Sequence, residues 1–417
     1  MFRPIALCTL ALAACAAPTD ETTTTNDYAL SGPVLDLTRE HVAGDVYHYE
    51  AVLAVGDTPN AELHVHRVVR ERAPWVPRAG RDAAMLLHGD FSTFRTNYLP
   101  EGGGMAGYLA TRGIDVWGVD RRWASAPVDA DLSDFGDMGL AQELGDVRTA
   151  LGFARAVRLL NGRTDRMTLV GFSRGGQIAY AYASQEATRT VRHVDGLVPL
   201  DVYFTLAPED EPTRQFFCES AALERQWLAD GVVDSENSFV ITAGQLAIDA
   251  PDDESPLFPG FTNRQTMLML VGQTYNAAPF TPLYHLAAPV LDGDLPVGLR
   301  FSDEGVVAGW LASASLHQSM REAAESDALW CGDAPLPIDA PLDRIQIPLY
   351  YLGAAGGMGD HGLYTTTLVS STDVTADVIR RLPAEGEAED FGHADLLFAT
   401  DAAALAWKPL AAWIEAH

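Results

Sequence analysis

The chain has 417 residues, of which 47% are hydrophobic and 20% are charged, and its formal net charge at pH 7 is −29. This composition is typical of a globular protein large enough for one big core with an inserted lobe, or for two domains. The acidic balance argues against nucleic acid or an anionic membrane surface as a partner, because both would be repelled.

The N-terminus is typical of an export signal. A positively charged start precedes the apolar run 5–14, which is too short to span a bilayer as a mature helix. The run ends in Leu12-Ala13-Ala14-Cys15, which resembles the lipobox of bacterial lipoproteins. The resemblance implies a signal peptide over 1–14, lipid attachment at Cys15 and a location in the bacterial cell envelope, with the membrane reached through this anchor. An ordinary secretory signal is the alternative. Residues 15–32 read as a flexible tether.

Two cysteines remain beyond this segment, Cys218 and Cys331. In an exported protein two cysteines can form one disulfide, and two buried free thiols are the alternative.

Short apolar runs alternate with helical patterns along most of the chain. Alternation of this kind predicts a mainly parallel sheet, here of eight strands, flanked by helices on both faces. The predicted strands are 46–55, 61–69, 83–87, 114–119, 167–170, 194–202, 347–352 and 378–382, and the main predicted helices are 105–112, 140–160, 176–184 and 402–415.

The run 203–343 interrupts this rhythm. It is rich in aromatic residues, and proline and glycine break several of its helical patterns. A structureless loop of this length is implausible, so we predict a mostly helical cap inserted between two late strands. The core is then formed by residues 33–202 and 344–417.

A serine stands at a sharp turn after the strand 167–170. Gly171-Phe172-Ser173-Arg174-Gly175 reads as a strand, a tight turn and the start of a helix. That context is typical of the nucleophile elbow of α/β-hydrolases, in which the serine hydroxyl is exposed above the sheet. The pentapeptide alone also fits a serine that caps a helix N-terminus.

A serine nucleophile needs a base and a carboxylate that orients the base, and in this architecture they follow in the order serine, acid, histidine. His393 lies after the last predicted strand, where a loop can return it to Ser173. We predict Asp360 as the acid, because it ends a glycine-rich loop after the strand 347–352. Asp201, at the end of the preceding strand, is the alternative.

The oxyanion hole of such a site requires two backbone N–H groups. We expect one from Arg174 and the other from Asp90 or Phe91, which follow the strand 83–87. A carboxylate at Asp90 would be unfavourable there unless neutralised, and Arg174 is the expected partner. Independent, solvated side chains are the alternative. The sequence gives no zinc-ligand spacing and no phosphate-binding loop, so we expect no metal and no cofactor.

Several segments are similar to the acid lipases of the gastric and lysosomal type within the α/β-hydrolase superfamily. They are Leu86-Leu87-His88-Gly89, Gly113-Ile114-Asp115-Val116-Trp117-Gly118, Gly171-Phe172-Ser173-Arg174-Gly175, Gly356-Gly357-Met358-Gly359-Asp360 and His393-Ala394-Asp395-Leu396-Leu397-Phe398. The resemblance implies an α/β-hydrolase fold with Ser173 as nucleophile, Asp360 as orienting acid and His393 as base.

The sequence therefore predicts an exported serine hydrolase that cleaves a carboxylic ester, in part apolar, through an acyl-enzyme intermediate. An amidase or peptidase with the same triad is one alternative. A non-catalytic binding lipoprotein on a hydrolase fold is another, because fold does not imply function.

Overall fold

The structure is a computed structural model, and it describes residues 32–274, 284–333 and 336–417. The signal peptide, Cys15 and nearly all of the tether lie outside the described residues. No helix in the described part of the chain combines the length and apolar character needed to cross a membrane.

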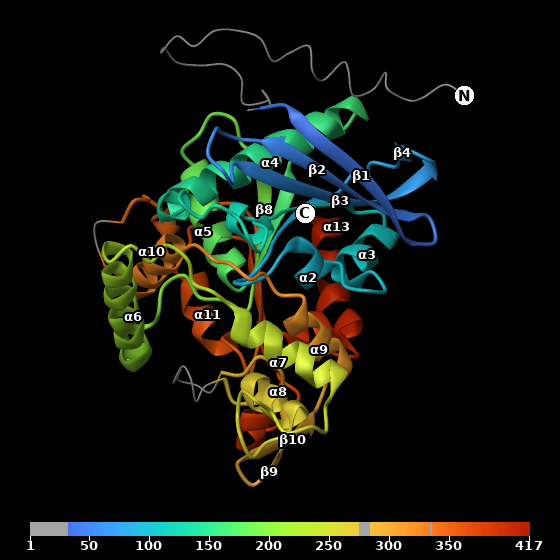
Figure 1. Ribbon diagram of the computed structural model, residues 1–417. Coiled ribbons are helices and arrows are strands. Elements are labelled where there is room, and N and C mark those ends of the chain that lie inside the picture. Colours follow the sequence, from blue (N-terminus) through green and yellow to red (C-terminus); the bar gives the residue numbers. More distant parts are fainter. Residues whose placement is uncertain (1–31, 275–283, 334–335) are drawn as a thin grey trace.

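A twisted sheet forms the centre of the molecule, and the order of its strands is β1-β2-β3-β6-β5-β7-β8-β11-β12, with β4 paired to β3 (Figure 1). Neighbouring strands in the series β6, β5, β7, β8, β11 and β12 are parallel. The pairs β1–β2, β2–β3, β3–β4 and β3–β6 are antiparallel. The bounds are β1 Val34–Ala43, β2 Val46–Ala54, β3 Glu62–Ala73, β4 Val76–Pro77, β5 Ala83–Leu87, β6 Asp115–Val119, β7 Met167–Phe172, β8 Val194–Leu200, β11 Leu349–Ala354 and β12 Val374–Ile379.

All eight predicted strands are present, and the described sheet has two more, so the predicted number of eight is corrected to ten. The strand β1 was missed because most of its residues are exposed on both faces, and no apolar alternation marks it. The short β4 is a two-residue extension of the β3 hairpin. The last strand, β12, begins earlier than the sequence indicated, and its outer position leaves much of it exposed.

Helices cover both faces of the sheet. On one face α4 and α5 bury residues such as Leu144, Leu151 and Ile178 against the strands. On the other face α3 and α13 do so through Leu109 and Leu410. The bounds of the core helices are α2 Phe94–Tyr98, α3 Gly104–Thr111, α4 Leu140–Leu160, α5 Arg174–Glu186, α11 Gly359–Thr366, α12 Asp395–Phe398, a π-helical turn Ala403–Trp407 and α13 Lys408–Ala416.

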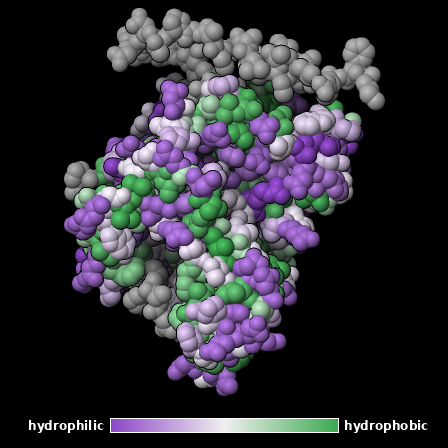
Figure 2. Space-filling model, viewed as in Figure 1, coloured by the Kyte–Doolittle hydropathy of each residue, from purple (hydrophilic) through white to green (hydrophobic). Residues whose placement is uncertain are grey.

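The predicted helical insertion lies between β8 and β11. Its elements are α6 Glu211–Ala229, α7 Ser238–Asp249, α8 Asn263–Gly272, β9 Pro289–Asp292, β10 Leu295–Leu299, α9 Glu304–Ala312 and α10 Met320–Cys331. Figure 1 shows two groups within it: α6 pairs with α10, while α7, α8, α9 and the β9–β10 hairpin lie together further along the molecule. Hydrophobic side chains are exposed in the region of α7 and α9 (Figure 2). The exposed large hydrophobic residues of these two helices include Phe239, Ile248 and Val306.

Candidate active site

Ser173 stands at the junction of β7 and α5, in the sharp turn that the sequence indicated. Its backbone has φ 55° and ψ −129°, and its side chain makes no capping hydrogen bond, unlike a helix N-cap. The two flanking glycines are required by close backbone approach. A Cβ at Gly171 would lie 2.2 Å from the Gly175 carbonyl oxygen, and a Cβ at Gly175 would lie 2.2 Å from the Leu87 carbonyl oxygen. Ser173 is half-buried beside the end of β5.

His393 lies in the loop after β12, and its acid partner is Asp201. The His393 Nδ1 atom lies 2.6 Å from Asp201 Oδ2, and both side chains are almost completely buried. Ser173 follows β7 and Asp201 follows the adjacent strand β8, whereas His393 comes from the loop after β12, two strands further along. The three side chains therefore lie at the carboxyl ends of the parallel strands. The imidazole also stacks on Phe172, the residue before Ser173, with ring centroids 4.4 Å apart.

The prediction that Asp360 contacts His393 is wrong. Asp360 lies in the first turn of α11, where its half-exposed carboxylate forms an ion pair with Arg380 at 2.6 Å. The glycine-rich loop does reach the site, as expected, but it contributes the backbone N–H group of Met358 rather than the carboxylate, and Ala354 at the end of β11 contributes a second N–H group. Asp201 Oδ1 accepts a hydrogen bond from Ala354 N at 2.7 Å, and Oδ2 accepts one from Met358 N at 3.0 Å.

This loop has glycine where it passes over Asp201. A Cβ at Gly357 would lie 2.2 Å from Asp201 Oδ2 and 3.2 Å from His393 Cα. The glycine signal in the sequence therefore marks the cradle of the acid, not the acid itself. Asp201, the alternative acid, has a positive φ of 46°, a conformation that non-glycine residues adopt where the surrounding structure enforces it.

The residues predicted for an oxyanion hole converge beside Ser173. Asp90, Phe91 and Arg174 line the same cavity as Ser173 and His393. None of their three backbone N–H groups donates a hydrogen bond to a residue that the structure describes. Phe91 has φ 47°, and its carbonyl accepts a hydrogen bond from Ser315 N in the insertion. Which of Asp90 and Phe91 supplies the second donor stays a prediction.

The predicted pairing of Asp90 with Arg174 is present. Arg174 Nε lies 3.1 and 3.2 Å from the two carboxylate oxygens, and Gln318 donates a further hydrogen bond to Asp90. Burial opposes ionisation of Asp90, but the charges of Arg174 and Arg121 outweigh it and lower the pKa of that carboxyl. The negative charge beside the oxyanion position is therefore neutralised.

Arg174 also connects the elbow to the insertion. Its Nη2 atom lies 3.3 Å from Asp327 of α10, and its guanidinium lies over the ring of Trp330, 4.4 Å from the centroid. Burial raises the pKa of Asp327 to about 6, although Arg174 acts in the opposite direction. Burial, with Asp327 nearby, raises the pKa of Glu224 to about 8.

The helix α10 is held against the core along its length. Glu322 pairs with Arg121 at 2.8 Å, Gln177 donates to the Ser326 carbonyl at 3.1 Å, and Trp330 donates to the Tyr203 carbonyl at 2.8 Å. The predicted disulfide between Cys218 and Cys331 is formed, and it joins α10 to α6. This half of the insertion is therefore fixed to the edge of the sheet that carries Ser173.

Ser173 and His393 open into a cavity of about 320 Å³. One end carries the charged residues Asp90, Arg174 and Asp327. The remainder is mainly apolar and is lined by Phe217, Val240, Tyr284, Leu286, Trp310, Leu311, Trp330 and Met358. Cavities with an apolar wall and a few polar groups are typical of sites for small organic ligands.

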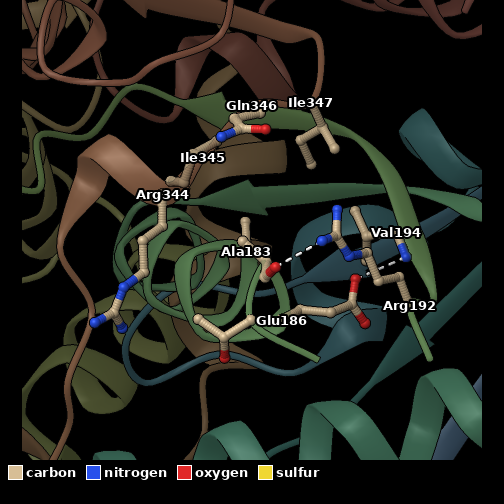
Figure 3. Close-up of a pocket in the computed structure, with 10 residues that line it drawn as sticks. Ala183, Glu186, Arg192, Val194, Arg344, Ile345, Gln346 and Ile347 are labelled. Atoms are coloured by element: carbon tan, nitrogen blue, oxygen red, sulfur yellow. Dashed lines mark hydrogen bonds between the residues drawn. The ribbon is translucent and has the colours of Figure 1, made fainter. Parts of the chain in front are cut away.

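Two other features carry no chemistry that we can assign. A cavity of about 180 Å³ lies at the opposite end of β8, where Arg192 donates to the Ala187 carbonyl and Glu186 accepts from Val194 N (Figure 3). One group of potential metal ligands, His48, Glu50 and His66, occurs in the described part of the chain. The two rings already hydrogen-bond to each other, Nε2 of His48 to Nδ1 of His66, at 3.0 Å.

Comparison with known proteins places the fold. No family model matches the chain, and its sequence matches no curated protein. A candidate lipase from Sulfolobus solfataricus is similar in structure, with a TM-score of 0.62 and 16% identity, over 92% of this chain and 99% of that one. A monoglyceride lipase from Saccharomyces cerevisiae gives a TM-score of 0.45 and 13% identity, over 96% and 99% of the two chains. The chain has the α/β-hydrolase fold, and the comparisons do not show the acid-lipase resemblance.

Proposed function

We propose that the protein is a serine hydrolase that cleaves carboxylic esters. The observation that carries the proposal is the buried contact of 2.6 Å between His393 and Asp201, at a cavity that His393 shares with Ser173. A carboxylate on Nδ1 fixes the tautomer in which Nε2 can accept the serine proton. The strained turn presents the Ser173 hydroxyl to the same cavity.

The reaction that follows from this arrangement has two halves. Ser173 Oγ attacks the ester carbonyl while His393 takes its proton, and the N–H of Arg174 with that of Asp90 or Phe91 stabilises the oxyanion. His393 then returns the proton to the leaving alcohol, which departs and leaves an acyl group on Ser173. Water then attacks the acyl carbonyl while His393 takes a proton from it, and His393 returns this proton to Ser173 Oγ as the bond to the acyl group breaks and the acid product leaves. Asp201, at Nδ1, supports the imidazolium in both halves.

A labelling experiment separates this proposal from a non-catalytic binding protein. A fluorophosphonate should modify the wild-type protein once, on Ser173, as measured by intact mass and peptide mapping. Ser173→Ala and His393→Ala should not react, whereas Asp360→Asn should react at the wild-type rate. Absence of modification in the folded wild-type protein would contradict a serine hydrolase. Comparison of matched ester and anilide substrates then tests the amidase or peptidase alternative.

We also propose that the protein is exported and anchored through Cys15. The Cys218–Cys331 disulfide supports export, because disulfides persist in oxidising compartments and are rare in the bacterial cytosol. Expression with labelled palmitate should label the wild-type protein and leave Cys15→Ser unlabelled. Equal labelling of the two, or a mature N-terminus downstream of Cys15, would rule out the anchor.

A further inference from the structure

A second, mainly apolar cavity lies near the one that contains Ser173, and it opens to solvent along a rim that includes Glu101, Thr111 and Val306. It has a volume of about 420 Å³ and is bounded by the β1–β2 hairpin, the glycine-rich segment 102–104, α3, α9 and the segment around α12. Val42, Val46, Tyr108, Val306, Leu397 and Trp407 line it, and Glu101 is the charged residue in its lining. The mechanism proposed above uses none of these residues.

Two aromatic rings stand between the cavities. Trp310 lines the cavity of Ser173 and Phe398 lines the second cavity, and their ring centroids are 5.3 Å apart. The helix α9 also contributes to both, because Val306, one turn before Trp310, faces the second cavity. The two spaces therefore meet at the Trp310–Phe398 contact.

Trp310 is held there by packing alone. Its indole Nε1 is buried, and it has no hydrogen-bond partner among the residues that the structure describes. Trp330, on the opposite side of the same cavity, donates to the Tyr203 carbonyl at 2.8 Å. Rotation of Trp310 breaks no hydrogen bond, whereas rotation of Trp330 breaks one. By this measure the wall at Trp310 opens at a lower cost than the wall at Trp330.

Two glycines, Gly103 and Gly107, line the second cavity without a side chain. Ideal Cβ atoms at Gly103 and Gly107 would lie 3.2 and 3.7 Å from Val42 Cγ1, which borders the cavity. A longer side chain at Gly107 would enter the space itself. The path from the Ser173 cavity to the second cavity is mainly apolar and is narrow at the Trp310–Phe398 contact. An unbranched alkyl chain fits such a path.

We propose that the second cavity receives the distal part of a long fatty acyl chain whose ester group lies at Ser173, and that Trp310 is the specificity-determining residue at the entrance. The inference rests on the proposed esterase function and names its substrate class. Short acyl chains fit the first cavity alone. Long chains displace the indole ring and gain burial in the second cavity.

The first test compares p-nitrophenyl palmitate with p-nitrophenyl butyrate. Trp310→Ala should raise the palmitate-to-butyrate ratio of kcat/KM by at least about tenfold, because a long chain no longer has to displace the indole ring; tenfold corresponds to about 1.4 kcal/mol. Gly107→Leu should lower that ratio by at least about tenfold because it fills the second cavity. Thr111→Trp, at the exposed rim of the second cavity, fills the same space without replacing a glycine, and it should lower the ratio as well. Trp227→Ala, a tryptophan removed from the exposed face of α6, is the matched control and should leave the ratio unchanged. A ratio unchanged in Trp310→Ala, or in both blocking variants, would overturn the proposal.

A binding experiment needs no turnover and separates this inference from the proposed function. Palmitate is titrated into Ser173→Ala, and into the same protein carrying Trp310→Ala or Thr111→Trp. Trp310→Ala should tighten the binding of palmitate by at least about tenfold, and Thr111→Trp should weaken it. Equal affinities would overturn the inference even if ester hydrolysis is established. Absence of hydrolysis in the wild-type protein would instead overturn the esterase proposal, whatever the palmitate affinities.

Discussion

Replacement of Asp201 by asparagine tests the assignment of the acid most directly. Asp201 is fully buried and accepts hydrogen bonds from Ala354 N, Met358 N and His393 Nδ1. An asparagine has one acceptor oxygen, so in either orientation its NH₂ group faces at least one backbone N–H. If NH₂ faces His393, the imidazole is held in the tautomer that cannot accept the Ser173 proton.

The substitution should change both the stability of the protein and its turnover. The loss of an acceptor for a buried N–H should lower the free energy of unfolding by about 1–3 kcal/mol. The wrong tautomer should lower kcat by about 10²- to 10⁴-fold with a small change in KM. The matched control is Asp360→Asn, in which a half-exposed ion pair with Arg380 is worth at most about 1 kcal/mol and kcat should not change.

The assay is hydrolysis of p-nitrophenyl butyrate across a substrate range, beside urea unfolding of both variants. Circular dichroism confirms that each variant is folded at the assay temperature. The reasoning would be refuted if Asp360→Asn lost more activity than Asp201→Asn. It would also be refuted if Asp201→Asn kept kcat within a factor of three of the wild-type value.

Three further predictions concern the same site. Ser173→Ala should abolish ester hydrolysis and leave the thermal melt close to that of the wild-type protein, so residual turnover within tenfold of wild type would remove Ser173 from its role. Gly357→Ala should lower kcat by about ten- to a hundredfold, because the added Cβ displaces Asp201 Oδ2, and wild-type kcat in this variant would contradict the cradle. Glu224, whose pKa is raised to about 8 by burial and by Asp327, binds its proton more tightly in the folded state, so its contribution to stability is present at low pH and is lost as the pH rises toward 8. Glu224→Gln should therefore raise the melting temperature at pH 8.5 relative to wild type and leave it nearly unchanged at pH 5, and a parallel shift at both values would argue against this titration.

The sequence predicted the parts of the fold that depend on local pattern. The run 167–175 specifies its strand, turn and helix through apolar residues and two closely packed glycines, and the structure has these elements. The insertion was predictable because a long interruption of a strand–helix alternation has few other interpretations. The strand β1 was not, because an exposed edge strand has no buried face to impose an apolar alternation.

The acid of the site shows where such reasoning stops. The loop 356–360 was placed correctly at the catalytic edge of the sheet. Such a loop can place its own carboxylate beside the histidine. It can also donate backbone N–H groups to a carboxylate that comes from another strand, and the loop has the same residue types in both cases. The choice depends on which side of the loop faces Asp201, a matter of tertiary packing that glycine content does not encode.

The disulfide has a consequence for the unfolded chain. Cys218 and Cys331 are 113 residues apart in the sequence, and the bond closes nearly the whole insertion into one loop. Closing a loop of about 100 residues removes conformational entropy from the unfolded state worth about 4–5 kcal/mol, a large share of the net stability of an ordinary domain. A chain made in a reducing cytosol would lack this contribution, and the helix it would loosen is the one that carries Asp327 and Glu322 to the elbow. The packing of α10 against the elbow is thereby coupled to the oxidation of one cysteine pair.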